Sequence, residues 1–172
     1  MKNTKNDRNA IKKVVTASLF AALICVATMI IKIPSLLKGY LNLGDCVVLL
    51  AGWMLSPVYA FAAAGIGSAL ADIFSGYAFY APATFLIKGL MSLLAFYLSE
   101  ALSKKISATA SRIISGISAE ILMVGGYFLF EGILYGFTAS AVNIPANAIQ
   151  GTAGIILGIL IIKVLDKRNF KI

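Results

Sequence analysis

Long apolar runs separated by short polar breaks make up most of the chain. A helix needs about 20 apolar residues to cross a hydrocarbon core of about 30 Å, and most of the runs reach or approach that length. The run that begins at Leu43 is shorter and makes only about 20 Å of helix. We expect it to be a tilted helix buried by its neighbours, or to begin a few residues earlier. The pattern predicts six transmembrane helices, over Val14–Ile33, Leu43–Leu55, Val58–Ser75, Pro82–Leu102, Ile113–Leu134 and Ile144–Leu165.

The composition also indicates an all-α integral membrane protein. Of the 172 residues, 60% are hydrophobic and 13% are charged, and the mean hydropathy of +0.92 is far above that of an ordinary soluble domain. We predict a single membrane domain over residues 1–172, with a basic segment 1–13, a six-helix bundle 14–165 and a basic tail 166–172. The first run is longer than the apolar region of a signal peptide, so we expect it to be retained.

Lysine and arginine are distributed in a way that predicts the topology, because they accumulate on the cytoplasmic side of membrane proteins. With six crossings and a cytoplasmic N-terminus, 12 of the 15 basic residues fall on that side. The exceptions are Lys32, Lys38 and Lys88. Both termini are therefore predicted to be cytoplasmic. Anionic lipid accounts for the net charge of +8 without a nucleic-acid partner.

Several chemistries are excluded by residues that the chain lacks. It has no histidine, which removes His-based catalytic triads and His metal sites. It has no G-x-x-x-x-G-K-[ST] loop, so it does not bind ATP in the P-loop manner. Cys25 and Cys46 lie on different apolar runs and fit packing better than a disulfide or a metal pair. We expect no cofactor or metal bound by this chain, and an energy source in a partner or a gradient.

The ionisable residues inside the runs gather toward the outer half of the membrane. Asp45, Asp72, Lys88 and Glu131 lie near outer ends of the predicted helices, whereas Glu120 lies toward the inner half. Helical spacing places polar residues on one face of each of the last three helices. Polar faces in lipid point inward, so we expect these three to converge. The faces comprise Tyr80, Thr84 and Lys88; Glu120, Tyr127 and Glu131; and Asn143, Asn147 and Gln150.

The loops that lead into this region, Lys38–Asp45 and Ser75–Pro82, are rich in aromatic residues and glycine. Aromatic rings beside a few hydrogen-bonding groups are typical of a site for a small polar ring compound. The candidate substrate-binding residues are Tyr40, Asn42, Asp45, Asp72, Tyr77, Tyr80, Thr84, Lys88, Tyr127, Glu131, Asn143, Asn147 and Gln150.

Structural roles are open alternatives for several of these residues. Lys88 by itself also fits a side chain that extends to the membrane surface. The aromatic residues of 75–82 fit an interfacial belt, and Asn147 and Gln150 fit hydrogen bonds between helices. Glu120 is better interpreted as a structural residue or a partner contact than as a ligand-binding residue. The shared depth and helix face of the set favour a binding site, which none of these alternatives predicts.

Small residues recur at four-residue spacing on the first and third runs. Ala17 and Ala21 form one such pair, and Ala63, Gly67 and Ala71 continue the spacing on the third run. Small residues let helices approach closely in lipid. On the pattern alone, packing within the bundle is the simpler interpretation.

Three stretches resemble the substrate-binding S components of energy-coupling factor (ECF) vitamin transporters: Tyr40–Glu100, Gly125–Leu134 and Asn143–Gly158. The elements "NLGD", "DIFSGY" and "YAPATFLIKG" are similar to those of the branch that takes riboflavin, pyridoxine or hydroxymethylpyrimidine. Trp53–Pro57 departs from the smoother run usual in the family, at a position that we do not expect to affect the site.

The resemblance implies a six-helix, non-enzymatic capture subunit in the cell membrane of a prokaryote, with both termini in the cytoplasm. The substrate would bind in the outer half, under the first and third outer loops and between the last three helices. The subunit would dock on a transmembrane T component driven by two ATPases, partly through Ala17 and Ala21, and ATP would be used by those partners only. The implied substrate is pyridoxine-like or hydroxymethylpyrimidine-like, with riboflavin also a candidate.

Within this resemblance, Lys88 would be held by Asp72 or would face a substrate oxygen with Glu131 nearby. Lys88→Met is then expected to lower ligand affinity and to leave the protein folded. An ion- or proton-coupled carrier that works without ATPases is the main alternative, since Asp72, Lys88 and Glu131 also fit a proton relay. An intramembrane enzyme lacks a nucleophile–base pair, and a purely structural subunit leaves the outer polar cluster unexplained.

Overall fold

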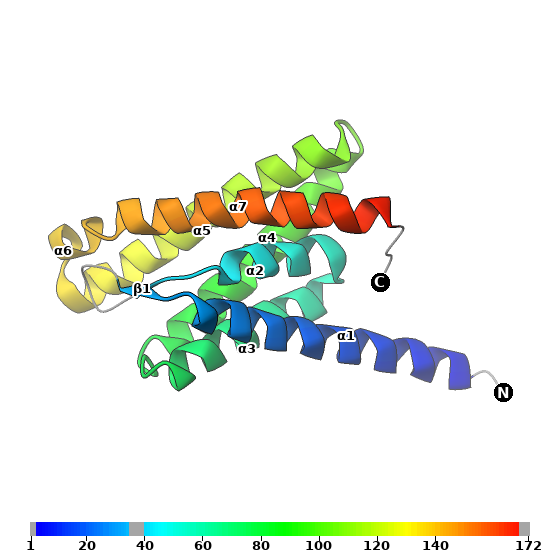
Figure 1. The fold of residues 1–172 in the computed structure, drawn as a ribbon, viewed down its shortest axis with the longest axis horizontal. Coiled ribbons are helices and arrows are strands. Elements are labelled where there is room, and N and C mark those ends of the chain that lie inside the picture. The colour runs from blue at the N-terminus through cyan, green and yellow to red at the C-terminus, as the bar shows by residue number, and fades with distance from the viewer. Residues whose placement is uncertain (1–2, 35–39, 169–172) are drawn as a thin grey trace.

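The structure is a computed structural model that describes residues 3–34 and 40–168 (Figure 1). It is built from helices and one pair of two-residue antiparallel strands. The elements are α1 (Asn3–Ile30), β1 (Ile33–Pro34), β2 (Tyr40–Leu41), α2 (Gly44–Met54), α3 (Pro57–Phe74), α4 (Ala81–Ser103), α5 (Ala108–Tyr135), α6 (Phe137–Ala141) and α7 (Ile144–Lys167).

The helical membrane fold predicted from the sequence is confirmed. Five segments are long and apolar enough to cross a membrane: Asp7–Ile30, Pro57–Phe74, Ala81–Ser103, Ala108–Tyr135 and Phe137–Lys167. Helix α2 has only 11 residues, or about 16 Å of helix. Eight of its residues are buried. The expectation that this short apolar run forms a helix buried by its neighbours is therefore confirmed.

Local sequence signals account for where the helices begin and end. Three helices, α3, α4 and α7, carry proline in their first turn, where the missing N–H has no intrahelical partner to lose. The Ser107 hydroxyl caps α5 by accepting a hydrogen bond from the Ala110 backbone N–H. Gly136 ends α5 with a positive φ of 89°, a conformation that glycine adopts without steric cost.

The helices pack as a chain of neighbours with α2 at the centre. Helix α1 packs on α3, α3 on α4, α4 on α5 and α5 on α7, while α2 lies against α4, α7 and α1. Fully buried side chains from five helices meet in the core: Ile24, Leu49, Met91, Met123 and Ile162. In lipid, such close van der Waals packing holds helices together, since the surrounding tails are as apolar as the side chains.

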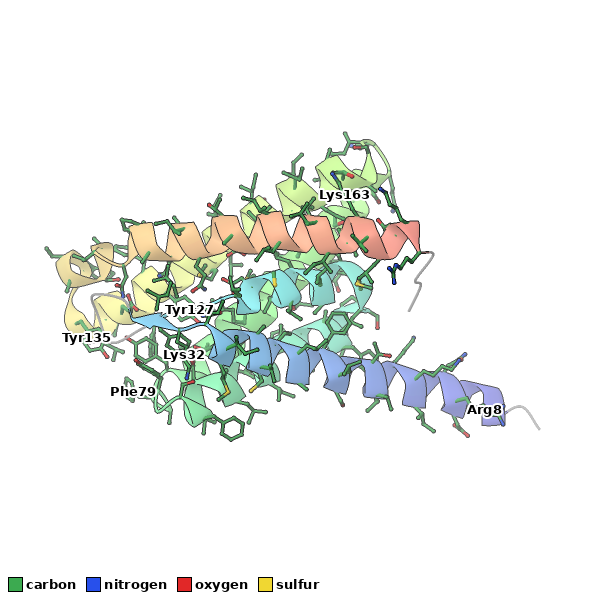
Figure 2. All side chains as sticks on the ribbon, viewed as in Figure 1. Arg8, Lys32, Phe79, Tyr127, Tyr135 and Lys163 are labelled. Carbon is green, nitrogen blue, oxygen red and sulfur yellow. The ribbon has the colours of Figure 1, made fainter. Side chains whose placement is uncertain are left out.

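The bundle has two different ends. The start of α1 and the end of α7 lie together at one end, here called the terminal end, and α6 and the strands lie at the other, the strand end (Figure 1). Arg8 and Lys163 lie near the terminal end, whereas Lys32, Phe79 and Tyr135 lie near the strand end (Figure 2). Three basic residues used to predict the topology, Lys2, Lys38 and Lys171, lie outside the described residues.

Two features at the strand end differ from the sequence prediction. Helix α1 ends at Ile30, three residues earlier than expected, because Ile33 and Pro34 pair with Leu41 and Tyr40. Proline has no N–H to continue a helix and biases the preceding residue toward extended backbone. The short helix α6 was not predicted. It is held to α5 by a hydrogen bond from the Ser140 hydroxyl to the Phe128 carbonyl, at 2.8 Å.

Candidate ligand-binding site

A polar cavity lies at the strand end, between β2, the end of α3, the α3–α4 connection, α4, α5 and α7. Its cavity volume is about 40 Å³. Figure 2 labels one of its wall residues, Tyr127. All eleven residues that line it belong to the set predicted from the sequence: Tyr40, Asn42, Asp72, Tyr77, Tyr80, Thr84, Tyr127, Glu131, Asn143, Asn147 and Gln150.

Tyrosine rings form one wall of the cavity. The ring centroids of Tyr40 and Tyr77 are 5.0 Å apart, and those of Tyr77 and Tyr80 are 6.4 Å apart with the planes at 85°. These are favourable separations for tilted and edge-to-face aromatic pairs. The Tyr40 hydroxyl donates a hydrogen bond to Asp72 Oδ1 at 2.8 Å. Burial, followed by the nearby Asp72 carboxylate, raises the pKa of Tyr40 well above its usual value, so this hydroxyl keeps its proton.

Another part of the wall joins α5 to α7. Asn143 Nδ2 donates to both carboxylate oxygens of Glu131, at 3.1 and 3.0 Å. The Tyr127 hydroxyl of α5 reaches across to α4 and donates to Thr84 Oγ1 at 3.1 Å. The polar faces predicted on the last three long helices therefore do converge in space.

Asn42 and Gln150 connect the β2 segment to α7. The Asn42 backbone N–H donates to Gln150 Oε1 at 2.9 Å, and Asn42 Nδ2 donates to the same oxygen at 3.3 Å. Asn42 Oδ1 accepts from the Gly44 N–H at 2.8 Å, which starts α2 with an Asx turn. Gln150 Nε2 in turn donates to Asp45 Oδ2 at 2.7 Å. The Gln150 side chain of α7 thus holds both Asn42, which follows β2, and Asp45 in the first turn of α2.

Lys88 and Asp45 form an ion pair next to the cavity and do not line it. Lys88 is 3% exposed and Asp45 is 0% exposed, so Lys88 does not extend to the membrane surface. Of the two roles expected for Lys88, pairing with Asp72 was wrong, and contact with a substrate oxygen stays a prediction. Helix α2 inserts between α4 and α7 and brings its first-turn Asp45 to the ammonium group. Apolar periodicity does not show where a short helix inserts, so the sequence offered no signal for this partner.

Glu120, which was interpreted from the sequence as a structural residue or a partner contact, lies outside the cavity and beside the Lys88–Asp45 pair. Both of its carboxylate oxygens are buried and have no hydrogen-bond partner among the described residues. It packs against the α7 backbone, since a Cβ built on Gly151 lies 2.8 Å from Glu120 Oε2. A Cβ on Gly154 lies 3.1 Å from Glu120 Oε1 and 2.9 Å from Asp45 Cβ. Glycine at these positions lets a buried carboxyl approach the helix axis.

Three polar atoms of the cavity wall lack partners in the described part of the protein. They are Asp72 Oδ2, Tyr80 Oη and Asn143 Oδ1, and all three are buried. Buried polar groups in proteins are nearly always hydrogen-bonded, and each unpaired one destabilises by about 1–3 kcal/mol. These atoms are therefore positioned to bond a ligand or water in the cavity.

The small residues of α1 lie on a different part of the molecule. Ala17 is buried and Ala21 is half-buried, and both line a shallow apolar groove between α1 and α3. The approach is close, since a Cβ on Gly67 lies 2.5 Å from the Ala21 backbone oxygen. This stripe therefore serves packing within the bundle, as the simpler interpretation of its pattern predicted, and still borders an open groove.

Comparison with known proteins agrees with this architecture. The chain matches the sequence model of a family described as "ECF-type riboflavin transporter, S component" over residues 8–167. A protein of Pyrococcus woesei, named "Uncharacterized protein in gap 3'region", is 33% identical over 147 residues, which cover 84% of this chain and 95% of the relative. A solved structure titled "Structure and mechanism of the S component of a bacterial ECF transporter" superposes with a TM-score of 0.73. It is 28% identical, and the match covers 92% of this chain and 97% of that one.

Proposed function

This chain belongs to the family of ECF-type riboflavin transporter S components, and from that membership we propose how it acts. It captures a small water-soluble vitamin or vitamin precursor in the polar cavity and delivers it inward with partner subunits. The members of this family are described as components of transporters, and the family is not a class of enzymes. The chain is a multi-pass membrane protein, with the fold of a solved S component.

One observation carries the proposal: a cavity walled by tyrosine rings contains buried polar atoms that have no partner among the described residues. A ligand with an aromatic ring stacks on Tyr40, Tyr77 or Tyr80, and its polar substituents bond Asp72 Oδ2 and Asn143 Oδ1. Pyridoxine-like and hydroxymethylpyrimidine-like compounds fit this description, and riboflavin has the same combination of ring and hydroxyl groups. Sites of this kind bury most of the ligand surface with a few placed polar groups.

The proposed assembly places the chain on a transmembrane T component with two ATPases, which supply the energy. The sequence holds no P-loop of its own. The groove between α1 and α3, bordered by Ala17 and Ala21, supports docking of a partner helix, because small residues permit close approach in lipid.

The proposed topology is a single membrane domain of six crossings, with both termini in the cytoplasm of a prokaryote and the cavity facing out. The start of α1 and the end of α7 lie at the same end of the bundle (Figure 1), which supports an even number of crossings. Arg8 and Lys163 near that end support its cytoplasmic position through the positive-inside rule.

A binding screen on detergent-purified protein tests the function. B-vitamins and their precursors are titrated by calorimetry and tyrosine and tryptophan fluorescence, with no ATP and no ion gradient, and with heat-unfolded protein as the control. We expect one compound to bind with nanomolar affinity. If folded protein instead transports the compound in liposomes under a proton or sodium gradient without ATPases, the chain is a gradient-coupled carrier and the proposal is wrong.

A further inference from the structure

Helix α1 borders an apolar groove on the side that faces α2 and α7, here called the α1–α7 groove. Helix α2 packs against both of these long helices but has only 11 residues, whereas α1 has 28 and α7 has 24. The long helices therefore leave a space beside α2, with a volume of about 920 Å³. The apolar residues that line it include Leu19, Leu23, Leu50, Ile161 and Leu165.

A polar pocket adjoins the α1–α7 groove at the terminal end and is here called the terminal pocket. It has a volume of about 430 Å³, and Lys12, Thr16 and Met54 line both spaces. Among the described residues, no aspartate or glutamate lines either space. Side chains that can donate hydrogen bonds make up most of the terminal pocket: Asn9, Lys12, Lys13, Thr16, Ser56 and Tyr59.

Lys12 and Lys13 bring positive charge to the depth of the lipid phosphates. Both are exposed, and neither forms an ion pair with a described carboxylate. They directly precede Val14, where the first apolar run begins, so their ammonium groups lie at the edge of the hydrocarbon core. Each lysine at this depth strengthens binding of anionic lipid about fivefold.

The α1–α7 groove has the length and the residues that suit a lipid chain. From Lys12 to Leu23, α1 rises about 16 Å, which is close to the half of a hydrocarbon core of about 30 Å that one leaflet fills. Close packing of a partner helix in lipid uses small residues, such as those of the groove beside α3. Large side chains such as Leu19 and Leu23 line the α1–α7 groove instead, which favours a flexible chain over a helix.

We propose that the terminal pocket and the α1–α7 groove together form a binding site for one anionic phospholipid. Lys12 and Lys13 bind its phosphate, and one acyl chain lies along Leu19 and Leu23. Every lipid-facing groove contacts acyl chains, but this one ends in a cationic pocket that matches the charge of the headgroup. Under the proposed topology, the lipid comes from the cytoplasmic leaflet. The site lies at the opposite end of the protein from the ligand cavity, so it goes beyond the proposed function and does not depend on it.

Binding of defined lipids to the purified protein tests the proposal. Wild-type protein is freed of native lipid in detergent, and phosphatidylglycerol and phosphatidylcholine with the same acyl chains are titrated and counted by native mass spectrometry. We expect one phosphatidylglycerol to bind at least tenfold more tightly than phosphatidylcholine. Equal binding of the two lipids overturns the proposal and leaves the groove to a partner helix. Inorganic phosphate is the third probe. Displacement of phosphatidylglycerol by an equal concentration of phosphate would identify a site for a free anion and overturn the lipid proposal.

Two charge-matched double variants locate the headgroup. Lys12→Gln with Lys13→Gln removes the lysines of the terminal pocket. Lys104→Gln with Lys105→Gln removes two exposed lysines of the α4–α5 connection that line neither space. We expect the first to lose at least tenfold in affinity for phosphatidylglycerol, because each lysine contributes about fivefold, and the second to stay within twofold of the wild type. An equal loss in both variants, or a loss in neither, overturns the proposal.

A second pair of variants locates the acyl chain. Leu23→Trp fills the α1–α7 groove, and Leu129→Trp makes the same change at an exposed position of α5 that lines neither space. We expect Leu23→Trp to weaken both lipids at least threefold and Leu129→Trp to weaken neither. Wild-type affinity for phosphatidylglycerol in Leu23→Trp would overturn the proposal. Thermal unfolding checks that each variant is folded, and Leu19→Trp provides the same test if Leu23→Trp is not.

Discussion

Neighbouring helices are joined differently around the cavity and along the contact between α1 and α3. This contact, which includes Ala17, Ala21 and Gly67, is called the seam. Around the cavity, α4, α5 and α7 are joined by side chains, such as Tyr127 to Thr84 and Asn143 to Glu131. In the seam, helices meet almost backbone to backbone, with Gly67 against Ala21. The difference shows that long polar side chains keep helices apart around a space, whereas small residues close the space. A ligand site and a packing surface can therefore be distinguished by residue size along a helix face.

The two regions also differ in what they leave unsatisfied. The cavity has buried polar atoms without partners in the described part of the chain, while the seam has apolar side chains such as Ile66 and Leu70 exposed beside its groove. Exposed apolar groups are favourable in lipid, but unpaired buried polar groups are not. Substitutions in the cavity region should therefore affect ligand affinity, stability or both, and those in the seam should affect stability and leave ligand affinity unchanged.

The largest effect is expected at the ion pair beside the cavity. Lys88→Met leaves Asp45 buried and unpaired, and removing one partner of a buried pair typically destabilises by about 3–5 kcal/mol. Because Lys88 bonds Asp45 and does not line the cavity, we expect lower stability to dominate, in contrast to the sequence-based expectation of a folded variant with weak binding. Thermal unfolding in detergent measures the change.

Two further variants test why Lys88→Met is destabilised: a double variant that should restore stability, and a control at an exposed ion pair. The double variant Asp45→Asn with Lys88→Met removes both charges and should recover most of the lost stability. Arg112→Met breaks an ion pair whose partner Asp166 is 51% exposed and should change stability by less than about 1 kcal/mol. A stable Lys88→Met protein with normal unfolding would show that the pair is not structural.

The sequence predicted which residues face the cavity better than it predicted their partners. Helical spacing and depth selected the lining residues of the helices, because both follow from regular helix geometry, and the aromatic composition of the loops selected Tyr40, Asn42 and Tyr77. Spacing and depth do not show between which helices α2 packs, so the pairing of Lys88 with Asp45 was missed. The helix α6 was missed because its five residues are too few to show an apolar period. Whether the lining residues bind a ligand stays a prediction for the binding experiments.

A smaller effect is expected in the seam. In Gly67→Ala the new methyl group lies 2.5 Å from the Ala21 backbone oxygen and 3.0 Å from Ile24 Cβ, so α1 must move away from α3. Overpacking of this kind destabilises by about 1–3 kcal/mol. Affinity for the ligand should stay within twofold of the wild type, because no seam residue lines the cavity. Unfolding and calorimetric titration of the same sample measure both quantities.

Gly125→Ala is the matched control for the seam variant. It is also a glycine inside a long helix, but a Cβ there meets nothing within 4 Å. Alanine should then stabilise α5 by up to about 1 kcal/mol through helix propensity. If both variants destabilise equally, the close approach of α1 and α3 is not what Gly67 provides.

The smallest effect, and the sharpest distinction between stability and binding, is expected at Tyr80. Its hydroxyl is buried and has no partner among the described residues, so Tyr80→Phe should leave the stability of the ligand-free protein unchanged or raise it by up to about 1 kcal/mol. Affinity should fall about fivefold to tenfold, since a net hydrogen bond contributes about 1 kcal/mol. Tyr127→Phe is the control, because its hydroxyl already donates to Thr84, and its loss should lower the stability of the ligand-free protein. Unchanged affinity in Tyr80→Phe would mean that the ligand does not use this hydroxyl, and that the aromatic wall recognises the ring alone.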